Sequence, residues 1–376
     1  MTSATIARQY KSVLTYWANR TDKDNAGFVE FQGHDFSMRG MDSPLATISS
    51  GLGHAISFLG SDSLPVIGGA RKYYNAEGFV VGSVNATEHS VMCAGSKDDE
   101  VGTFRRLMET FPTGILSVVS DTWDLWKVLT EYLPTLKDEI LERYGKLVIR
   151  PDSGDPADIV CGDVHRVQGF NEAVLQKVGE GGLVYNYVDK KYYRVFTDHN
   201  GEVYGDIAVD SDITPNAKGV IELLWDIFGG TINSQGYKVL DPHIGAIYGD
   251  SITIDRAQNI CSRLESKGFA STNIVLGVGS FTYQFNTRDT FGFAMKATYV
   301  EVDGVGQEIF KDPITDDGIK KSAKGLMCVI KTDGKYKLVD QVDWESESIG
   351  YLETIYNNGE LYNQVSLSDV RQRLSK

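Results

Sequence analysis

Seven apolar, strand-like segments recur along the chain, and an acidic, basic, small polar or glycine-rich segment follows each of them. Most successive runs lie about thirty residues apart, which is the length of one strand-plus-helix unit. Polar residues at the carboxyl ends of successive buried strands are how a parallel α/β barrel builds its active site. The pattern therefore predicts an α/β protein with an irregular TIM-like (β/α) barrel. The seven runs are residues 29–31, 56–59, 84, 115–119, 147–149, 244–247 and 274–276.

Helical spacing of apolar residues fills the intervals between these runs. Pro134 should kink or split the longest predicted helix, because proline has no backbone N–H to donate. Asp121 or Thr122 would cap the start of that helix with a side-chain oxygen. The predicted helices cover residues 4–19, 43–54, 98–110, 122–144 and 219–229.

Two segments depart from the strand–helix rhythm. Alternating residues and turn dipeptides within residues 156–218 predict a β-hairpin insertion, and Asp333-Gly334 and Asn358-Gly359 predict hairpin turns between antiparallel strands. Ser366 and Asp369 resemble a capping box that starts a closing helix. We therefore expect three parts, which are an amino-terminal helix and linker (1–27), an α/β barrel carrying the insertion (28–297) and an antiparallel β region with its closing helix (298–376).

Composition narrows the classes of function. The formal charge is −14 at pH 7 and the pI is about 4.9, which disfavours a nucleic-acid surface but leaves room for a local basic cluster that binds a phosphorylated metabolite. No stretch approaches the roughly 18 apolar residues of a membrane span, and no signal peptide is recognisable. Cys93, Cys161, Cys261 and Cys328 are scattered, which indicates reduced thiols. We expect a cytoplasmic protein that binds neither nucleic acid nor membrane.

Four carboxylates stand at predicted strand ends, namely Asp62, Asp121, Asp152 and Asp250. A carboxylate there can orient a ribose diol, a magnesium ion, an amide or a histidine, and each one alone is equally consistent with a helix cap. His89 also follows a strand. Among carboxylates it would act as an acid, a base or a nucleophile, although a histidine that merely bonds a neighbouring loop fits the sequence as well.

Other strand-end residues suit a phosphorylated substrate that carries an aromatic ring. Arg150 and Asp152 flank a rigid turn, where guanidinium suits phosphate and carboxylate suits a ribose diol. Gly277-Val278-Gly279-Ser280 leaves backbone N–H groups at a helix start after the seventh strand, which is the usual phosphate position in a barrel. Phe36 can stack on a heteroaromatic ring, although an aromatic residue at a strand end more often belongs to the core.

A local basic run stands out in this acidic chain. It fits either a solvated helix face or a patch that binds a pyrophosphate leaving group. Its members are Arg288, Lys296, Lys311, Lys320 and Lys321.

Taken in order, these motifs resemble the nicotinamide phosphoribosyltransferase family, in its bacterial and phage branch. The resemblance runs from about residue 5 to the end of the chain. It implies an enzyme of NAD salvage, a pentosyltransferase that makes nicotinamide mononucleotide and pyrophosphate from nicotinamide and 5-phosphoribosyl 1-pyrophosphate. The matching stretches are His34-Asp35-Phe36 with Arg39-Gly40, Gly60-Ser61-Asp62, Glu88-His89-Ser90, Val118 to Asp121, Ile149 to Gly154, Gly249-Asp250, Gly277-x-Gly279, Thr287-Arg288-Asp289 and Phe310 to Pro313.

The resemblance also implies roles for individual residues. Phe36 would stack on the pyridine ring, and Asp62 would accept a hydrogen bond from the carboxamide while repelling nicotinate. Arg150 would lie near the ring and the nucleotide phosphate. The ribose would be held by Asp152, Gly249 and Asp250, and the 5′-phosphate by Gly279 and Ser280, of which Ser280 departs from the family's usual glycine.

The remaining implied roles concern ATP and pyrophosphate. His89 would be phosphorylated by ATP and oriented by Asp121. The pyrophosphate would travel with Mg²⁺, for which the chain supplies no dedicated ligand set. The pyrophosphate contacts would be Arg39, Arg288, Lys296 and Lys311, and some of them would reach across the interface of a homodimer with shared active sites.

Compared with the family, the chain begins where the barrel is about to begin. We therefore expect either a fragment or one half of a split enzyme, with a second polypeptide that supplies the family's amino-terminal segment. Two alternatives stay open. One is a nicotinate phosphoribosyltransferase, against which Asp62 argues, because a carboxylate facing a carboxylate weakens binding. The other is a non-catalytic nucleotide-binding subunit.

Overall fold

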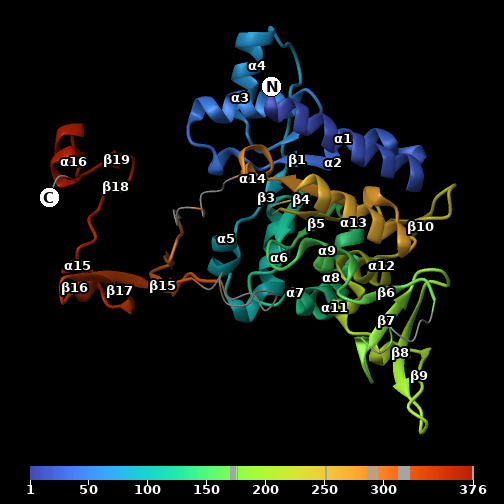
Figure 1. The fold of residues 1–376 in the computed structure, drawn as a ribbon. Coiled ribbons are helices and arrows are strands. Elements are labelled where there is room, and N and C mark those ends of the chain that lie inside the picture. Colours follow the sequence, from blue (N-terminus) through green and yellow to red (C-terminus); the bar gives the residue numbers. More distant parts are fainter. Residues whose placement is uncertain are drawn as a thin grey trace. The chain divides into compact units, whose positions relative to one another are not determined.

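The computed structural model of the chain describes residues 1–169, 175, 177–249, 252–285, 290, 295–311 and 322–374, drawn as a ribbon in Figure 1. The chain divides into two units. The first unit comprises Met1–Met295 with Lys311–Lys320, and the second comprises Lys296–Phe310 with Lys321–Lys376.

The first unit is built on a seven-stranded sheet in which every pair of neighbours is parallel. The strand order is β2-β1-β13-β12-β5-β4-β3, and the curled sheet forms half of a barrel, so the α/β class is confirmed. The strands are β1 (Gly33–Asp35), β2 (Gly60–Ser61), β3 (Asn85–Ala86), β4 (Thr113–Val119), β5 (Tyr144–Arg150), β12 (Ile244–Tyr248) and β13 (Ile274–Val278).

Helices cover this sheet and bury one face each. In α1 (Thr2–Thr21), Ala7, Tyr10, Leu14 and Trp17 are buried at intervals of three or four residues, which is the spacing of one helix face. The longer strands that they cover are rich in apolar residues, because a parallel sheet is buried on both faces, and β12 is buried throughout. The other covering helices include α3 (Pro44–Ala55), α6 (Glu100–Thr110), α8 (Leu133–Glu142), α12 (Val220–Phe228) and α13 (Ile254–Ser266).

The first two predicted strands were placed wrongly. Residues 29–31 belong to the short helix α2 (Val29–Gln32), in which the buried residues Val29 and Gln32 stand three apart. Residues 56–59 form a turn after α3, and Ile56 is 65% exposed. The strands themselves, β1 and β2, are short and carry polar residues, so a search for apolar runs passed over them.

The predicted helix over 122–144 is split as expected, but its cap lies elsewhere. It comprises α7 (Leu125–Lys127), a π-helical segment η4 (Val128–Tyr132) and α8, whose first turn contains Pro134. The wider turn of η4 precedes the proline, which has no N–H for a regular helical bond. Asp124 caps the start, since its side chain accepts a hydrogen bond from the Lys127 N–H at 3.0 Å, whereas Asp121 and Thr122 lie ahead of the helix.

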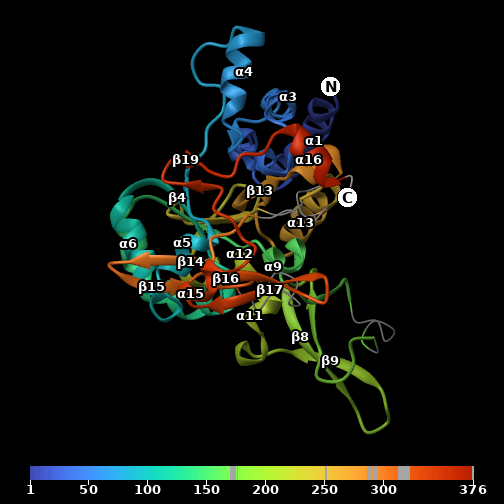
Figure 2. The same cartoon turned by 90° about the vertical axis from the view of Figure 1, so that its left-hand side faces the viewer.

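The predicted hairpin insertion is confirmed as a separate four-stranded sheet in the order β6-β7-β8-β9. In Figures 1 and 2 the hairpin of β8 and β9 extends beyond the helices around it. A buried lysine ties this sheet to the helices, because Lys267 Nζ lies 2.6 Å from both Tyr192 Oη and Glu222 Oε2. The strands are β6 (His165–Val167), β7 (Leu183–Asn186), β8 (Lys191–Thr197) and β9 (Val203–Ile207).

The second unit consists of antiparallel hairpins, as predicted. Asp333 and Asn358 take positive φ angles in the turns of two of them, a conformation that asparagine and aspartate tolerate. Ser366 and Asp369 exchange backbone-to-side-chain hydrogen bonds at the start of the last helix, which is a capping box. The elements are β14 (Tyr299–Val302), β15 (Val305–Glu308), β16 (Leu326–Thr332), β17 (Lys335–Val342), α15 (Trp344–Ser348), β18 (Tyr356–Asn357), β19 (Glu360–Leu361) and α16 (Leu367–Leu374).

Two sequence expectations concern the whole chain. All four cysteines are buried as thiols. Within the described ranges, none of the helices combines the length and the apolar character that crossing a membrane requires.

Candidate active site

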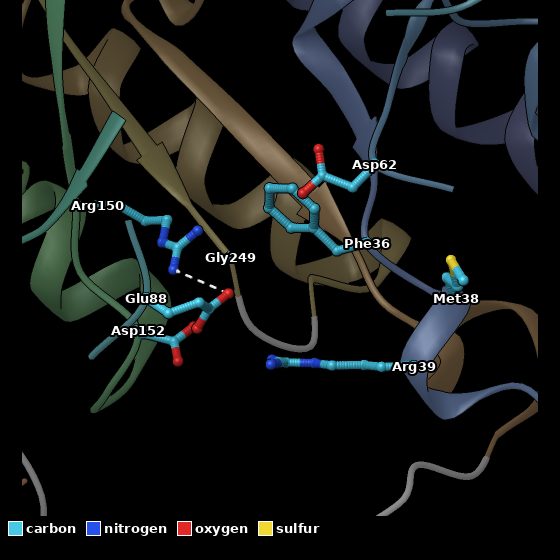
Figure 3. A pocket seen from close by; sticks show the side chains of 8 residues that line it. All are labelled: Phe36, Met38, Arg39, Asp62, Glu88, Arg150, Asp152 and Gly249. Carbon is cyan, nitrogen blue, oxygen red and sulfur yellow. Dashed lines mark ion pairs between the residues drawn. The ribbon is translucent and has the colours of Figure 1, made fainter. Parts of the chain in front are cut away.

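A cavity of about 320 Å³ opens at the carboxyl ends of the parallel strands. Its lining residues stand at the ends of β1, β2, β3, β5 and β12 or in the loops that follow them, so five strands contribute to one mouth (Figure 3). Ligands of parallel α/β sheets bind at this end, where the loops after successive strands converge. The lining residues are Phe36, Met38, Arg39, Asp62, Glu88, Arg150, Asp152 and Gly249.

Phe36 forms an aromatic wall of the cavity, and Gly277 makes room for its ring. A Cβ atom on Gly277 would lie 2.5 Å from Phe36 Cδ2, whereas one on Gly249 would lie in ordinary van der Waals contact, 3.5 Å from Phe36 Cε2. The Phe36 N–H also donates to the carbonyl of Val278 at 3.0 Å. The ring is therefore held against β12 and β13 by backbone rather than by flexible side chains.

Asp62 is an anchored carboxylate beside that ring. His34 Nε2 lies 2.8 Å from Asp62 Oδ1, and the Ser83 hydroxyl donates to the same oxygen. Burial by itself raises the pKa of the Asp62 carboxyl. Hydrogen bonds from His34 and Ser83, with the charge of Arg150 nearby, outweigh burial and lower the pKa below its usual value. Asp62 therefore presents a negative charge to a ligand.

Arg150 supplies a buried cation on the other side of the cavity. Its Nη2 donates to the carbonyl of Thr87 at 2.9 Å and lies 3.7 Å from Glu88 Oε1, an ion pair drawn as a dashed line in Figure 3. Its Nε–H is buried and meets no acceptor among the described residues. A buried donor without an acceptor is costly, so a bound anion or carbonyl oxygen would satisfy it.

His89 is the first residue of α5 (His89–Ala94) and meets both a carboxylate and a cation. Its Nε2 lies 3.7 Å from Asp152 Oδ2 and 3.2 Å from Lys311 Nζ. Its Nδ1 lies 3.2 Å from Thr122 Oγ1. The fold thus brings together His89, Asp152 and Lys311, which come from three distant parts of the sequence.

Asp121 has a different set of contacts from the one that we expected. Its Oδ2 accepts hydrogen bonds from the Asp152 N–H at 3.0 Å and from the Ser153 hydroxyl. The contact of His89 Nδ1 is with Thr122 instead. Asp121 therefore fixes the turn that carries Asp152, and direct orientation of His89 by Asp121 stays a prediction.

Comparison with known proteins places this site in a family. A profile of the nicotinate phosphoribosyltransferase (NAPRTase) family matches residues 31–360. The chain belongs to this family. Its relatives include nicotinamide phosphoribosyltransferases, so the resemblance read from the motifs is confirmed.

Three such relatives span a range of identity. The nicotinamide phosphoribosyltransferase of Acinetobacter baylyi is 46% identical over 382 residues, which cover 100% of this chain and 67% of that protein. The one from Mycoplasma pneumoniae is 38% identical, covering 84% of this chain and 57% of that protein. The one from Xanthomonas campestris pv. campestris is 31% identical, covering 99% of this chain and 68% of that protein. The chain thus spans about two thirds or less of these relatives' lengths.

Other predicted residues of this NAPRTase-family chain do not line the cavity or cannot be placed. Gly279 and Ser280 lie at the start of α14 (Ser280–Gln284), directly after β13, and are not among the lining residues. Lys296 belongs to the second unit. Asp250 and Arg288 lie outside the described residues. The roles predicted for these residues stay predictions.

Several residues at the site of this family member received no role from the sequence. Glu88 and Met38 line the cavity, while His34 and Ser83 form hydrogen bonds to the Asp62 carboxylate. A signal for Glu88 existed, since it directly precedes His89 at a strand end. His34 and Ser83 gave none, because their importance arises only when β1 and the Ser83 segment lie beside Asp62.

Proposed function

We propose that the protein is a nicotinamide phosphoribosyltransferase, which joins nicotinamide to the ribose of 5-phosphoribosyl 1-pyrophosphate and so forms nicotinamide mononucleotide for NAD salvage. The observation that carries the proposal is one cavity lined by an aromatic ring, an anionic hydrogen-bond acceptor and a buried arginine. These are Phe36, Asp62 and Arg150.

Recognition of nicotinamide follows from the first two of these side chains. The pyridine ring stacks on Phe36, and the carboxamide N–H₂ donates to the carboxylate of Asp62. Nicotinate would instead bring its own carboxylate against Asp62, whose pKa is lowered and whose charge is therefore retained. Two negative charges that face each other in the cavity disfavour binding. Nicotinate is therefore the second candidate substrate and not the first.

The chemistry is a displacement at the anomeric carbon of the ribose. The pyridine nitrogen donates its electron pair to form the new C–N bond, and the bond to the pyrophosphate oxygen breaks with its electron pair leaving on pyrophosphate. Asp152 and Glu88 face the cavity, so their negative charge suits a ribose that gains oxocarbenium character. Arg39 and Lys311 are cations suited to the departing pyrophosphate.

Mg²⁺ enters this scheme together with the pyrophosphate of the substrate. Magnesium is commonly bound by one or two carboxylates plus substrate phosphates, and Asp152 and Glu88 fit that arrangement. When bound, the ion would neutralise part of the charge of the leaving group.

His89 is the residue that would couple the reaction to ATP. Its Nε2 lies close to both Asp152 and Lys311, so a phosphoryl group carried there would adjoin Lys311, which is assigned to pyrophosphate, and Asp152, which is assigned to the ribose. His89→Ala should abolish stimulation by ATP and leave some basal turnover. Stimulation that persists in full would remove His89 from this role.

The proposal includes an assembly. It comprises a closed (β/α) barrel and a cytoplasmic homodimer with shared active sites. Gly82 forms an isolated parallel bridge to Gly60 of β2, and the chain then enters β3, which pairs with β4. The segment from Gly82 to β3 therefore connects the two ends of the strand order, which supports closure of the barrel. In support of a homodimer, Trp344 of the second unit is 60% exposed and Ile349 is 80% exposed. Large exposed apolar patches on a protein surface mark interaction sites.

The test is turnover by the purified protein. Nicotinamide, 5-phosphoribosyl 1-pyrophosphate and Mg²⁺ are supplied, and nicotinamide mononucleotide is measured by chromatography, with nicotinate in a parallel reaction. The proposal predicts product from nicotinamide and a much lower kcat/KM with nicotinate. Preference for nicotinate would support the second candidate. Binding of nicotinamide without any product would support a non-catalytic subunit.

A further inference from the structure

His34 occupies an unusual position for a polar residue, within the parallel sheet and between two neighbouring strands. It is the central residue of β1 and pairs with Gly60 of β2 and Gly277 of β13. Its exposure is 8%, and it is not among the residues that line the cavity. A buried imidazole in a strand requires a partner, because an unpaired polar group in a core is costly.

That partner is Asp62. His34 Nε2 lies 2.8 Å from Asp62 Oδ1. An ionised carboxylate can only accept, so the imidazole must carry its proton on Nε2 and donate it. The Ser83 hydroxyl donates to the same oxygen. Two donors thus occupy Oδ1, and Oδ2 is left to face a ligand.

The surrounding backbone fixes the imidazole in place. A Cβ atom on Gly60 would lie 2.7 Å from His34 Nδ1, so only glycine leaves room for the ring. The His34 ring also packs on the Phe36 ring, with centroids 4.8 Å apart and planes inclined by 48°. One imidazole therefore contacts both Phe36 and Asp62. These are the two side chains to which the proposed function gives the pyridine ring and its substituent, and both are drawn in Figure 3.

We propose that His34 is a positioning residue that sets the preference for a pyridine carboxamide over a pyridine carboxylate, by holding the Asp62 carboxylate toward the ring-binding cavity. This inference rests on the proposed function. Asp62 has a side chain that is 41% exposed, so without the buried donor only the exposed Ser83 hydroxyl would keep it from turning toward solvent. The carboxamide of nicotinamide would then lose its hydrogen-bond acceptor, and the carboxylate of nicotinate would no longer be repelled by Asp62.

The experiment compares three variants of the full chain. His34→Phe keeps a ring and removes the donor, whereas His34→Gln keeps an N–H donor of similar reach. His243→Phe is the matched control, because His243 also pairs with an aspartate, Asp241, at 2.7 Å, but precedes β12 at the opposite end of that strand. For each variant, KM and kcat are measured with nicotinamide and nicotinate, and both ligands are titrated calorimetrically without the second substrate.

The expected result is a loss of selectivity confined to the donor-free variant. A hydrogen bond to a charged group typically contributes tenfold to about a hundredfold in affinity. His34→Phe should therefore raise the KM and Kd for nicotinamide by roughly tenfold to a hundredfold, with kcat changed by less than about threefold, and bring the two ligands closer in affinity. His34→Gln should restore most of the preference, and His243→Phe should leave it unchanged.

Several results would overturn the inference. One is a preference in folded His34→Phe that stays within about twofold of the parent, and another is a loss in His34→Gln as large as in His34→Phe. If His34→Phe does not give a native circular dichroism spectrum, His34→Asn replaces it, since asparagine is polar but too short to reach Asp62. A parent chain that binds no nicotinamide would refute the proposed function together with the inference. A selective parent with an equally selective His34→Phe refutes the inference alone.

Discussion

Glu100 is a buried acid whose ionisation should make stability fall as pH rises. It is the first residue of α6 and is 3% exposed, and its Oε1 meets no donor among the described residues. Burial raises the pKa of Glu100 to about 7, and the charges of Asp124 and Asp121 act in the same direction, against smaller opposing effects of Lys127 and Lys97.

The size of this loss of stability follows from the pH interval over which Glu100 keeps its proton in the native state but not in the unfolded state. The unfolded carboxyl has a pKa of 4.5, and the folded one a pKa of about 7. Between these values the native state binds more protons than the unfolded state, so the free energy of unfolding decreases as pH rises. Each pH unit corresponds to about 1.4 kcal/mol, so the interval amounts to about 3 kcal/mol. Above pH 7 this stabilisation is lost in full.

Glu100→Gln removes the titration and keeps the shape. Urea unfolding at pH 5 and pH 8 should show the variant to be more stable than the parent by about 3 kcal/mol at pH 8 and nearly equal to it at pH 5. Glu109→Gln, on the exposed side of the same helix, is the control and should change stability by less than about 0.5 kcal/mol at either pH. A Glu100→Gln protein that is less stable than the parent at both pH values would refute the reasoning.

Three further predictions concern the cavity and the insertion. Asp62→Asn should reduce the preference for nicotinamide over nicotinate by about tenfold or more in kcat/KM, because it removes the charge that repels a carboxylate. Gly277→Ala should displace Phe36, whose Cδ2 would lie 2.5 Å from the new methyl group, and so raise the KM for nicotinamide by roughly tenfold in steady-state kinetics. Lys267→Met should cost about 3–5 kcal/mol in urea unfolding, because it leaves the Glu222 carboxylate without its buried cation.

Matched controls separate these effects from general damage. Gly245→Ala adds a methyl group in β12 whose nearest neighbour is the flexible side chain of Lys146 at 3.2 Å, so nicotinamide binding should not change. Lys11→Met breaks a partly exposed pair with Glu30 at 3.6 Å and should cost less than about 1 kcal/mol. Unchanged selectivity in Asp62→Asn, an unchanged KM in Gly277→Ala or a cost below about 1 kcal/mol in Lys267→Met would each contradict its prediction.

The sequence predicted the fold best where strands are long and apolar. β4, β5, β12 and β13 lie in a sheet that is covered on both faces, so their side chains must be apolar and the runs are easy to recognise. β1 reads Gly-His-Asp, because its side chains hold the site instead of filling the core. A strand with that composition cannot be distinguished from a loop by hydrophobic pattern, and the apolar run just before it proved to be a helix.

The candidate site was predictable to the extent that it depends on strand ends. The rule that loops after parallel strands converge was enough to bring Phe36, Asp62 and Asp152 to one cavity. The partners of these residues were not predictable in the same way. That His34 reaches Asp62, and that Thr122 reaches His89, depends on the register of neighbouring strands and on side-chain direction, which no local pattern encodes.

The central claim is that the cavity beside Phe36 and Asp62 is where nicotinamide binds. A crystal structure of the protein with nicotinamide mononucleotide tests it most directly. We predict the pyridine ring stacked against Phe36, the carboxamide nitrogen within hydrogen-bond distance of Asp62, and the ribose beside Asp152. Electron density for the nucleotide away from this cavity, or a carboxamide that turns its oxygen toward Asp62, would contradict the account.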